Sequence, residues 1–165
     1  MALTRKHACI IRAAESTASK ATFRHPWNPN SEMHGTILGR AAGLFRTGVN
    51  LIRVPPGKES FAYHAHLHEE EWIYVISGRA VIESGNTMHE IAAGDFIAFP
   101  TPSEPHLLRN NSAEEIVYLT GGERSHFDVA DFPRDGKRMV RIGERATVYK
   151  LAEGQTFPFP GVDPF

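Results

Sequence analysis

Short runs of apolar, β-branched and aromatic residues recur along the middle of the chain at intervals of about ten residues. Each run ends at a group of Pro, Gly, Asn or Ser residues, which favour turns. The run 72–77 has the strongest strand character, because β-branched and aromatic side chains fit a pleated surface. The expected strands are 49–54, 61–66, 72–77, 80–83, 88–91, 96–99, 106–109 and 116–119. This spacing is typical of an all-β sandwich or barrel rather than of alternating strands and helices.

The segments on either side of this region have weaker patterns. Residues 1–45 contain one short stretch with helical character, at 13–21, and loops with Pro, so we expect an irregular N-terminal arm that packs on the barrel. Residues 46–122 form the expected barrel core. Residues 123–165 form a C-terminal extension, in which alternation predicts short edge strands at 139–142 and 147–151. Its Pro- and Phe-rich tail, 157–165, is expected to lie against the barrel or a neighbouring subunit, since exposed Phe side chains favour association.

Composition narrows the class of protein. The 165 residues suffice for one domain with its own core. A net charge of −1 argues against nucleic acid as the main partner, because surfaces that bind nucleic acid are usually basic. Mean hydropathy is −0.30, and no apolar run approaches the roughly 18 residues of a membrane span. The apolar stretch at 8–11 is too short for a secretory signal, so we expect a cytoplasmic protein with no membrane partner.

Histidine is the unusual component, with nine residues in the chain. His64 and His66 are two apart on an expected strand, so both imidazoles point to one face. Glu71 opens the next strand, and His106 opens a later one. A closed barrel can bring such strand ends together. Three imidazoles and one carboxylate suit one divalent transition metal, such as Zn, Fe, Mn or Ni, and the single cysteine excludes a zinc site built from several thiolates.

These residues resemble the two sequence motifs of the cupin superfamily. The first motif has the form Gly, His-x-His, Glu, Gly, and the second has the form Gly, Pro-x-Gly, His, Asn. The matching positions are Gly57, His64, His66, Glu71 and Gly78, and then Gly94, Pro100, His106 and Asn110. The second motif differs from the family pattern, since Pro102 replaces a Gly and His106 lies one residue further from Pro100. The resemblance covers about residues 46–122 and implies a double-stranded β-helix, or jelly-roll barrel, with one metal held by His64, His66, Glu71 and His106.

Two alternatives concern the ligands. Glu69, Glu70 and Glu71 are adjacent, and the spacing to Gly78 favours Glu71, with Glu70 as the alternative. The other two acidic side chains are expected in a solvated turn. His68 shares strand parity with His66, but we expect it to face solvent.

The pocket around the metal is expected to be mainly apolar. The residues Ile73, Val75, Ile97 and Phe99 are expected in the core and along the substrate pocket. Arg53 and Arg109 are expected to reach a carboxylate of the substrate, with exposed salt bridges as the alternative.

The resemblance to cupins implies a metal-dependent enzyme, dioxygenase-like or isomerase-like, that acts on a small organic acid or an aromatic compound. Glu71 is then a candidate catalytic base. The alternative is a non-catalytic module in which a structural metal helps to bind a sugar or an organic acid. The family also implies a homodimer. We therefore expect a small-molecule ligand and a second copy of the chain as partners.

Overall fold

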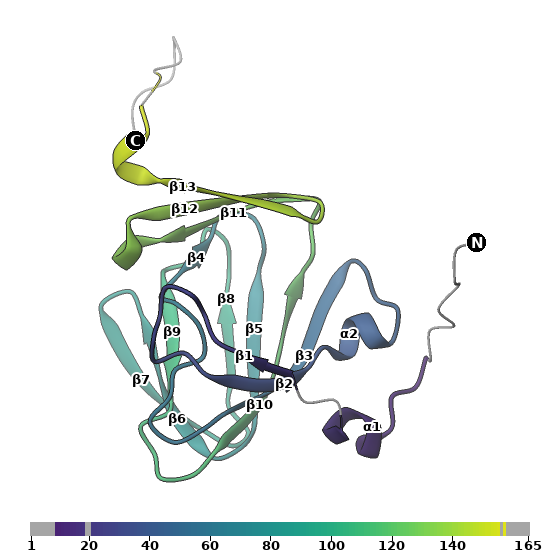
Figure 1. Cartoon of the computed structure of the whole chain (residues 1–165). Helices are drawn as coiled ribbons and strands as arrows, with labels where there is room; N and C mark the ends of the chain where they lie inside the picture. Colours follow the sequence, from purple (N-terminus) through teal and green to yellow (C-terminus); the bar gives the residue numbers. More distant parts are fainter. Residues whose placement is uncertain (1–8, 19–20, 156, 158–165) are drawn as a thin grey trace, which may run out of the picture.

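The computed structural model describes residues 9–18, 21–155 and 157 (Figure 1). Antiparallel strands form the body of the molecule, and the helices are short. The helical elements are α1 (Ala13–Ala18), α2 (Leu38–Ala41) and two 3-10 turns, η1 (Pro133–Asp135) and η2 (Leu151–Glu153). None of the helices in these ranges is long and apolar enough to cross a membrane.

Two walls of β-sheet face each other. One wall is a sheet in the order β1-β2-β3-β10-β5-β8. Its strands are β1 (Ala21–Phe23), β2 (Met33–Thr36), β3 (Thr47–Val54), β5 (Glu71–Ser77), β8 (Phe96–Phe99) and β10 (Ile116–Glu123). Strand β10 pairs with β3 on one side and on the other with β5, which begins at Glu71.

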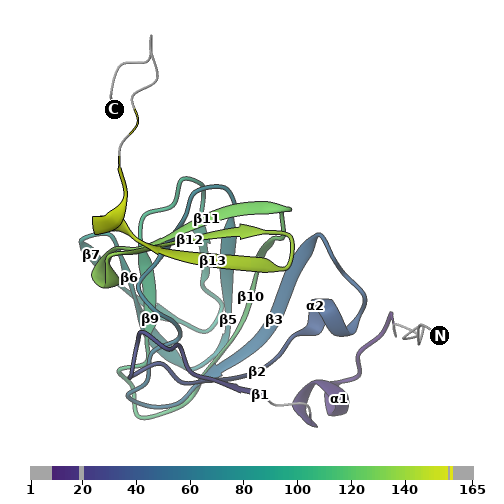
Figure 2. The same ribbon diagram turned by 45° about the horizontal axis from the view of Figure 1, so that its top comes forward.

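The opposite wall consists of two smaller sheets, β13-β12-β11-β4 and β7-β6-β9. Its strands are β4 (Ala65–His66), β6 (Arg79–Ser84), β7 (Thr87–Ala92), β9 (His106–Arg109), β11 (Phe127–Phe132), β12 (Lys137–Ile142) and β13 (Arg145–Lys150). A backbone bridge between His64 and His106 links the two sheets, and each residue donates its N–H to the carbonyl of the other. The result is the double-stranded β-helix expected from the sequence (Figure 2).

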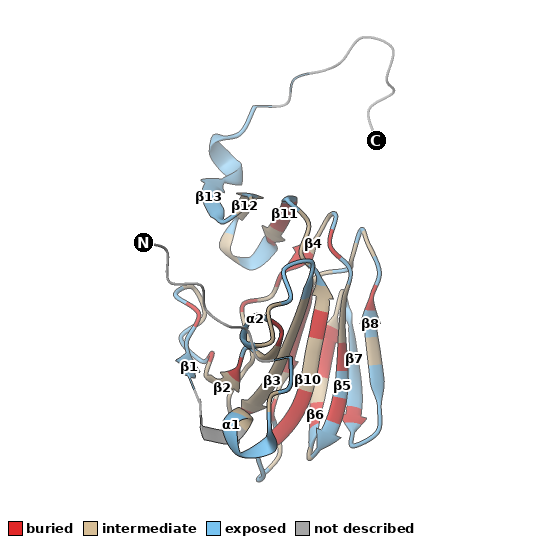
Figure 3. Cartoon of the chain, turned by 90° about the vertical axis from the view of Figure 1, so that its right-hand side faces the viewer, coloured by how far each residue is buried: buried red, intermediate tan, exposed pale blue. Residues whose placement is uncertain are grey.

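The main core lies between the walls. Ile73, Val75 and Phe99 are buried there, and Ile97 packs against them while partly exposed. A smaller cluster joins Phe132 and Ala130 to aromatic residues of the arm. Figure 3 shows the buried positions along β5 and β10, whereas β13 is exposed along its length. Ile73 and Val75, two residues apart on β5, are both buried, because one face of this wall is turned inward.

Several elements differ from the expectation. The predicted strand 61–66 is a strand only at Ala65–His66, while β1, β2, β11 and α2 were not predicted. Strand β11 has acidic residues at Asp128 and Asp131, which gave this segment the character of a loop. The arm is tied to the barrel because β2 pairs with β3. The predicted C-terminal tail lies outside the described residues apart from Phe157, which is exposed.

A glycine is required where β5 turns into β6. Gly78 has φ +82°, and a Cβ there would lie 2.7 Å from the Glu115 carbonyl oxygen. Gly57 has φ +73° with no heavy atom within 4 Å of such a Cβ. We expect Gly57→Ala to lower the free energy of unfolding by about 1–2 kcal/mol through backbone strain alone. Gly78→Ala should lower it further, as measured by chemical denaturation. Equal losses would contradict a steric role for the approach to Glu115.

Candidate metal centre

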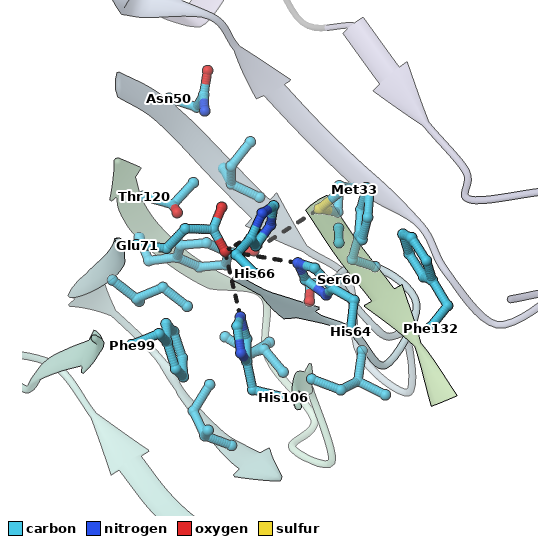
Figure 4. A pocket seen from close by; sticks show the side chains of 18 of the residues that line it. Met33, Asn50, Ser60, His64, His66, Glu71, Phe99, His106, Thr120 and Phe132 are labelled. Carbon is cyan, nitrogen blue, oxygen red and sulfur yellow. Dashed lines mark hydrogen bonds and ion pairs between the residues drawn. The ribbon is translucent and has the colours of Figure 1, made fainter. Parts of the chain in front are cut away.

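Three histidines and one glutamate converge at one end of the barrel interior (Figure 4). Oε2 of Glu71 lies 3.7 Å from Nε2 of His64, 3.5 Å from Nε2 of His66 and 3.4 Å from Nε2 of His106. His64 and His106 face each other across the backbone bridge between the smaller sheets, and Glu71 begins β5 on the opposite wall. The four side chains predicted from the sequence are thus brought together by both walls of the barrel.

Each imidazole presents the same nitrogen to the centre. Nδ1 of His64 donates to the Ala62 carbonyl oxygen at 2.9 Å, and Nδ1 of His106 donates to the Glu104 carbonyl oxygen at 3.1 Å. Carbonyl oxygens only accept hydrogen bonds, so these two rings carry their proton on Nδ1 when neutral. The lone pair on Nε2 therefore points toward Glu71, which is the arrangement of a metal ligand.

His66 is oriented by a carboxylate that the sequence analysis did not single out. Nδ1 of His66 donates to Oδ2 of Asp128 at 2.6 Å, and the Asp128 side chain is almost fully buried. Oδ1 of Asp128 accepts from the backbone N–H of His68. A sequence signal exists in retrospect, since Asp128 shares strand parity with the buried Ala130 and Phe132 of β11. A carboxylate on the buried face of a strand needs a hydrogen-bond donor or a cation as its partner.

The two acidic neighbours of Glu71 have different positions. Glu70 is exposed, so Glu71 is the carboxylate that faces the histidines. Glu69 is buried and accepts hydrogen bonds from Arg141 and from the backbone N–H of Ser125, so the expectation of a solvated Glu69 is wrong. His68 is exposed, as expected.

The charges of the cluster follow from burial and hydrogen bonding. Burial by itself raises the pKa of Glu71, but the neighbouring His106 and His64 rings outweigh it and hold the pKa well below its usual range. Burial lowers the pKa of His64. Burial also acts to lower the pKa of His66, but the Asp128 hydrogen bond and the Glu71 charge raise it overall.

This donor set fits a divalent transition metal. Neutral imidazole nitrogen and carboxylate oxygen suit Zn, Fe, Mn or Ni, whereas calcium prefers oxygen ligands alone. His64, His66 and Glu71 each offer a donor atom within 4.8 Å of the others. A second group with this spacing, His66 with Glu69 and Asp128, has its carboxylates engaged by Arg141 and by His66 itself. The first group is therefore the better candidate for an ion.

A cavity of about 310 Å³ adjoins the cluster. Its wall is mainly apolar and includes Ile73 and Phe99, as expected, and Phe99 stacks on the His106 ring with centroids 3.6 Å apart. Polar side chains are Asn50, Ser60 and Thr120 in addition to the cluster. The ring hydroxyl of Tyr118 is buried in this wall, which raises its pKa and keeps it protonated.

Four residues expected along the pocket are not part of its wall. Val75 and Ile97 belong to the core beyond it. Arg53 pairs with Glu115 at 3.0 Å, and Arg109 pairs with Glu59 and Glu83 at 2.8 and 2.7 Å. The prediction that these arginines reach a substrate is therefore wrong, and the salt-bridge alternative holds. Their guanidinium groups are held by acidic partners that sequence spacing does not reveal.

Comparison with known proteins places the chain in a family. Residues 50–121 match the family model of the cupin domain. A candidate sugar phosphate isomerase of Acidithiobacillus ferrooxidans has 33% sequence identity and a TM-score of 0.86, over 92% of this chain and 97% of that one. The chain belongs to the cupin superfamily. None of the curated proteins matches this cupin.

More distant structures share the cupin fold. A sugar phosphate isomerase from a cupin superfamily of Silicibacter pomeroyi has 23% identity and a TM-score of 0.73, over 84% of this chain and 89% of that one. A predicted oxalate decarboxylase of Thermotoga maritima has 20% identity and a TM-score of 0.58, over 70% of this chain and 99% of that one. At these identities the likeness supports the fold of this cupin. Its chemistry has to be argued from the residues of the site.

Proposed function

We propose that this cupin is a metal-dependent enzyme that isomerises a small hydroxy-carbonyl compound. The observation that supports a metal is the convergence of three Nε2 atoms on one oxygen of Glu71. His64, His66, His106 and Glu71 would hold the ion. An octahedral ion with four protein ligands keeps two positions for other groups, and it would polarise the carbonyl and hydroxyl oxygens of the substrate.

Glu71 is the proposed proton carrier. Among the described residues that line the cavity it is the only carboxylate, and its side chain is 33% exposed. Its low pKa keeps it ionised, as a proton acceptor must be, but also makes it a weak base. In the isomerisation, the Glu71 carboxylate oxygen that does not hold the ion takes the proton from the carbon that bears the hydroxyl group and returns it to the carbonyl carbon. The hydroxyl proton moves to the former carbonyl oxygen, so substrate and product have the same composition.

Isomerisation is preferred over oxygen chemistry for two reasons. The relative with 33% identity is described as a candidate sugar phosphate isomerase, and this chain covers nearly all of that protein. In addition, Asn50 and Thr120 are cross-strand partners on the cavity face of β3 and β10 and can hydrogen-bond the hydroxyl groups of a sugar. A dioxygenase-like reaction on an aromatic compound and a non-catalytic binding role are the alternatives. The apolar part of the cavity wall favours an aromatic substrate, as in the dioxygenase alternative.

The test begins with elemental analysis of the purified protein, for which we expect one transition metal per chain. The metal-loaded protein is then incubated with aldose and ketose phosphates, and the products are identified by NMR. Interconversion that is lost on chelation supports the proposal, and Glu71→Gln should abolish it. Bound metal with no interconversion would favour the binding module, and oxygen uptake with aromatic substrates would favour the dioxygenase.

The expected homodimer stays a prediction. Exposed apolar side chains on the outer side of β5 and β8 are where a second copy would bury surface, and these are Tyr74, Ile76 and Phe96. The ligand that we propose is a small molecule, with the metal as the one cofactor. Light scattering of the purified chain measures the state of assembly directly.

A further inference from the structure

A second hollow lies beyond the metal cluster, along the same strands. It has a volume of about 470 Å³ and lies between the start of β3 and the end of β10 on one side and the turn from β12 to β13 on the other. This turn lies beside the start of β3 in both views (Figures 1 and 2). The Arg40–Glu144 ion pair at 2.6 Å connects the turn to α2, which precedes β3. The arginines that line the hollow are Arg46, Arg124 and Arg141.

The register of β3 and β10 places two of these arginines in line with the cavity. Thr120 pairs with Asn50 in the cavity wall, and Gly122 pairs with Gly48 one step further along. The next step brings Arg124 to Arg46, whose carbonyl accepts the Arg124 N–H at 3.0 Å. Since side chains two apart point to the same face, Arg46 and Arg124 belong to the inward rows that carry Asn50 and Thr120.

The opposite wall has the same order. Met139 of β12 lines the cavity, and Arg141, two residues on, lines the hollow. On β11, Ala130 lines the cavity, and His126, four residues earlier, lines the hollow. Segments on or next to the four strands β3, β10, β11 and β12 therefore line both the cavity and the hollow.

Glycine occupies the step between the two spaces on β3 and β10. An added Cβ at Gly48 would lie 3.8 Å from Cγ of Arg124, so the Arg124 side chain extends over this backbone. Glu71 is the register partner of Gly122 on the neighbouring strand β5. An added Cβ at Gly122 would lie 3.3 Å from Cγ of Glu71. The absence of side chains at Gly48 and Gly122 thus gives room to the side chains of Arg124 and Glu71, which lie at successive positions on the same face.

The charges in the hollow are not fully paired. Arg141 is engaged by Glu69, and Glu144 is held by Arg40 at 2.6 Å. Arg124 reaches Glu144 only at 3.9 Å. No carboxylate in the described part of the chain forms an ion pair with Arg46. Glu123 also lines the hollow, and its carboxylate accepts from the Glu70 N–H. Arg46 and Arg124 are therefore the guanidinium groups with donors to spare for an anion.

We propose that Arg46 and Arg124 bind the phosphate group of a substrate whose hydroxy-carbonyl end lies at His64, His66, His106 and Glu71. This inference rests on the proposed function and adds the substrate class, a phosphorylated sugar. Two residues of strand separate the row of Glu71 from that of Arg124, which is about 6.8 Å. Two residues of extended backbone contain about six bonds, so a sugar chain of similar length can reach from one row to the other. The planar guanidinium group fits phosphate oxygens in pairs.

The test compares metal-loaded wild type, the double variant Arg46→Gln with Arg124→Gln, and the control Arg79→Gln. Arg79 is also exposed and lies on β6, away from the hollow. Calorimetry with inorganic phosphate measures binding without turnover. We expect the double variant to bind phosphate about 10- to 100-fold more weakly, the loss expected from one charged hydrogen bond. Its metal content and its binding of unphosphorylated sugar should stay as in wild type, and Arg79→Gln should bind phosphate normally.

The outcomes separate this inference from the proposed function. Unchanged phosphate affinity in the double variant would overturn the inference, even if the enzyme interconverts sugar phosphates. Phosphate binding that depends on Arg46 and Arg124, with no interconversion of any sugar, would keep the anion site and overturn the isomerase. If sugar acids bind through these arginines more tightly than phosphorylated sugars, the assignment to phosphate is wrong.

Discussion

Replacing His66 with Ala is expected to remove stoichiometric metal from the purified protein and to abolish its activity. His66 supplies one of three imidazole nitrogens around Glu71, and its ring is 13% exposed, so little solvent can take its place. The substitution also leaves the buried carboxylate of Asp128 without its hydrogen-bonded partner. The loss of affinity should exceed the roughly 10- to 100-fold typical of an outer-shell change, because a ligand atom is removed. Elemental analysis and titration with a metal-sensitive chelator measure the effect.

His68→Ala is the matched control. His68 is two residues further on, is exposed, and contacts Phe127 with ring centroids 5.2 Å apart. We expect this variant to retain one metal per chain and wild-type stability. Full metal content in His66→Ala, or a comparable loss in His68→Ala, would show that the ion is held elsewhere.

Asp128→Asn should weaken metal binding by about 10- to 100-fold while leaving all four ligands in place. The carboxylate of Asp128 only accepts, because its pKa is lowered by the His66 hydrogen bond despite burial. It therefore keeps the His66 proton on Nδ1 and the lone pair on Nε2. An asparagine amide can instead donate to Nδ1, which moves the ring proton to Nε2 and takes that nitrogen away from the metal. Asp128 is thus a positioning residue.

Nitrogen NMR of the imidazole in metal-free protein distinguishes this role from a general loss of structure. We expect the His66 signals to shift toward the Nε2-protonated form in Asp128→Asn and to keep their wild-type pattern in Asp131→Asn. Asp131 lies on the same strand, where it pairs with Arg138 at 2.6 Å. An unchanged His66 tautomer together with wild-type metal affinity in Asp128→Asn would refute the positioning role.

The part of the fold that the sequence predicts comes from short apolar runs that are bounded by turn residues. Strands β3, β5 and β10 fall on runs of apolar and β-branched residues that are visible in the sequence, and β5 has buried positions at every second residue. Strand β11 was missed because Asp128 and Asp131 interrupt its apolar pattern, and both are compensated by partners distant in the sequence, His66 and Arg138. The short strands β1 and β2 depend on pairing with β3, which is a tertiary contact.

The sequence by itself determined the family, the central strands and the four residues proposed as metal ligands, because motif spacing and strand parity are local properties of the chain. Only the tertiary structure decided that Asp128 orients His66, that Glu69 is buried, and that Arg53 and Arg109 are held by glutamates instead of facing the cavity. The same holds for Arg46 and Arg124, which lie 78 residues apart and meet through the register of β3 and β10. Such pairings depend on which strands become neighbours when the barrel closes, and neighbours of this kind leave no periodic trace in the sequence.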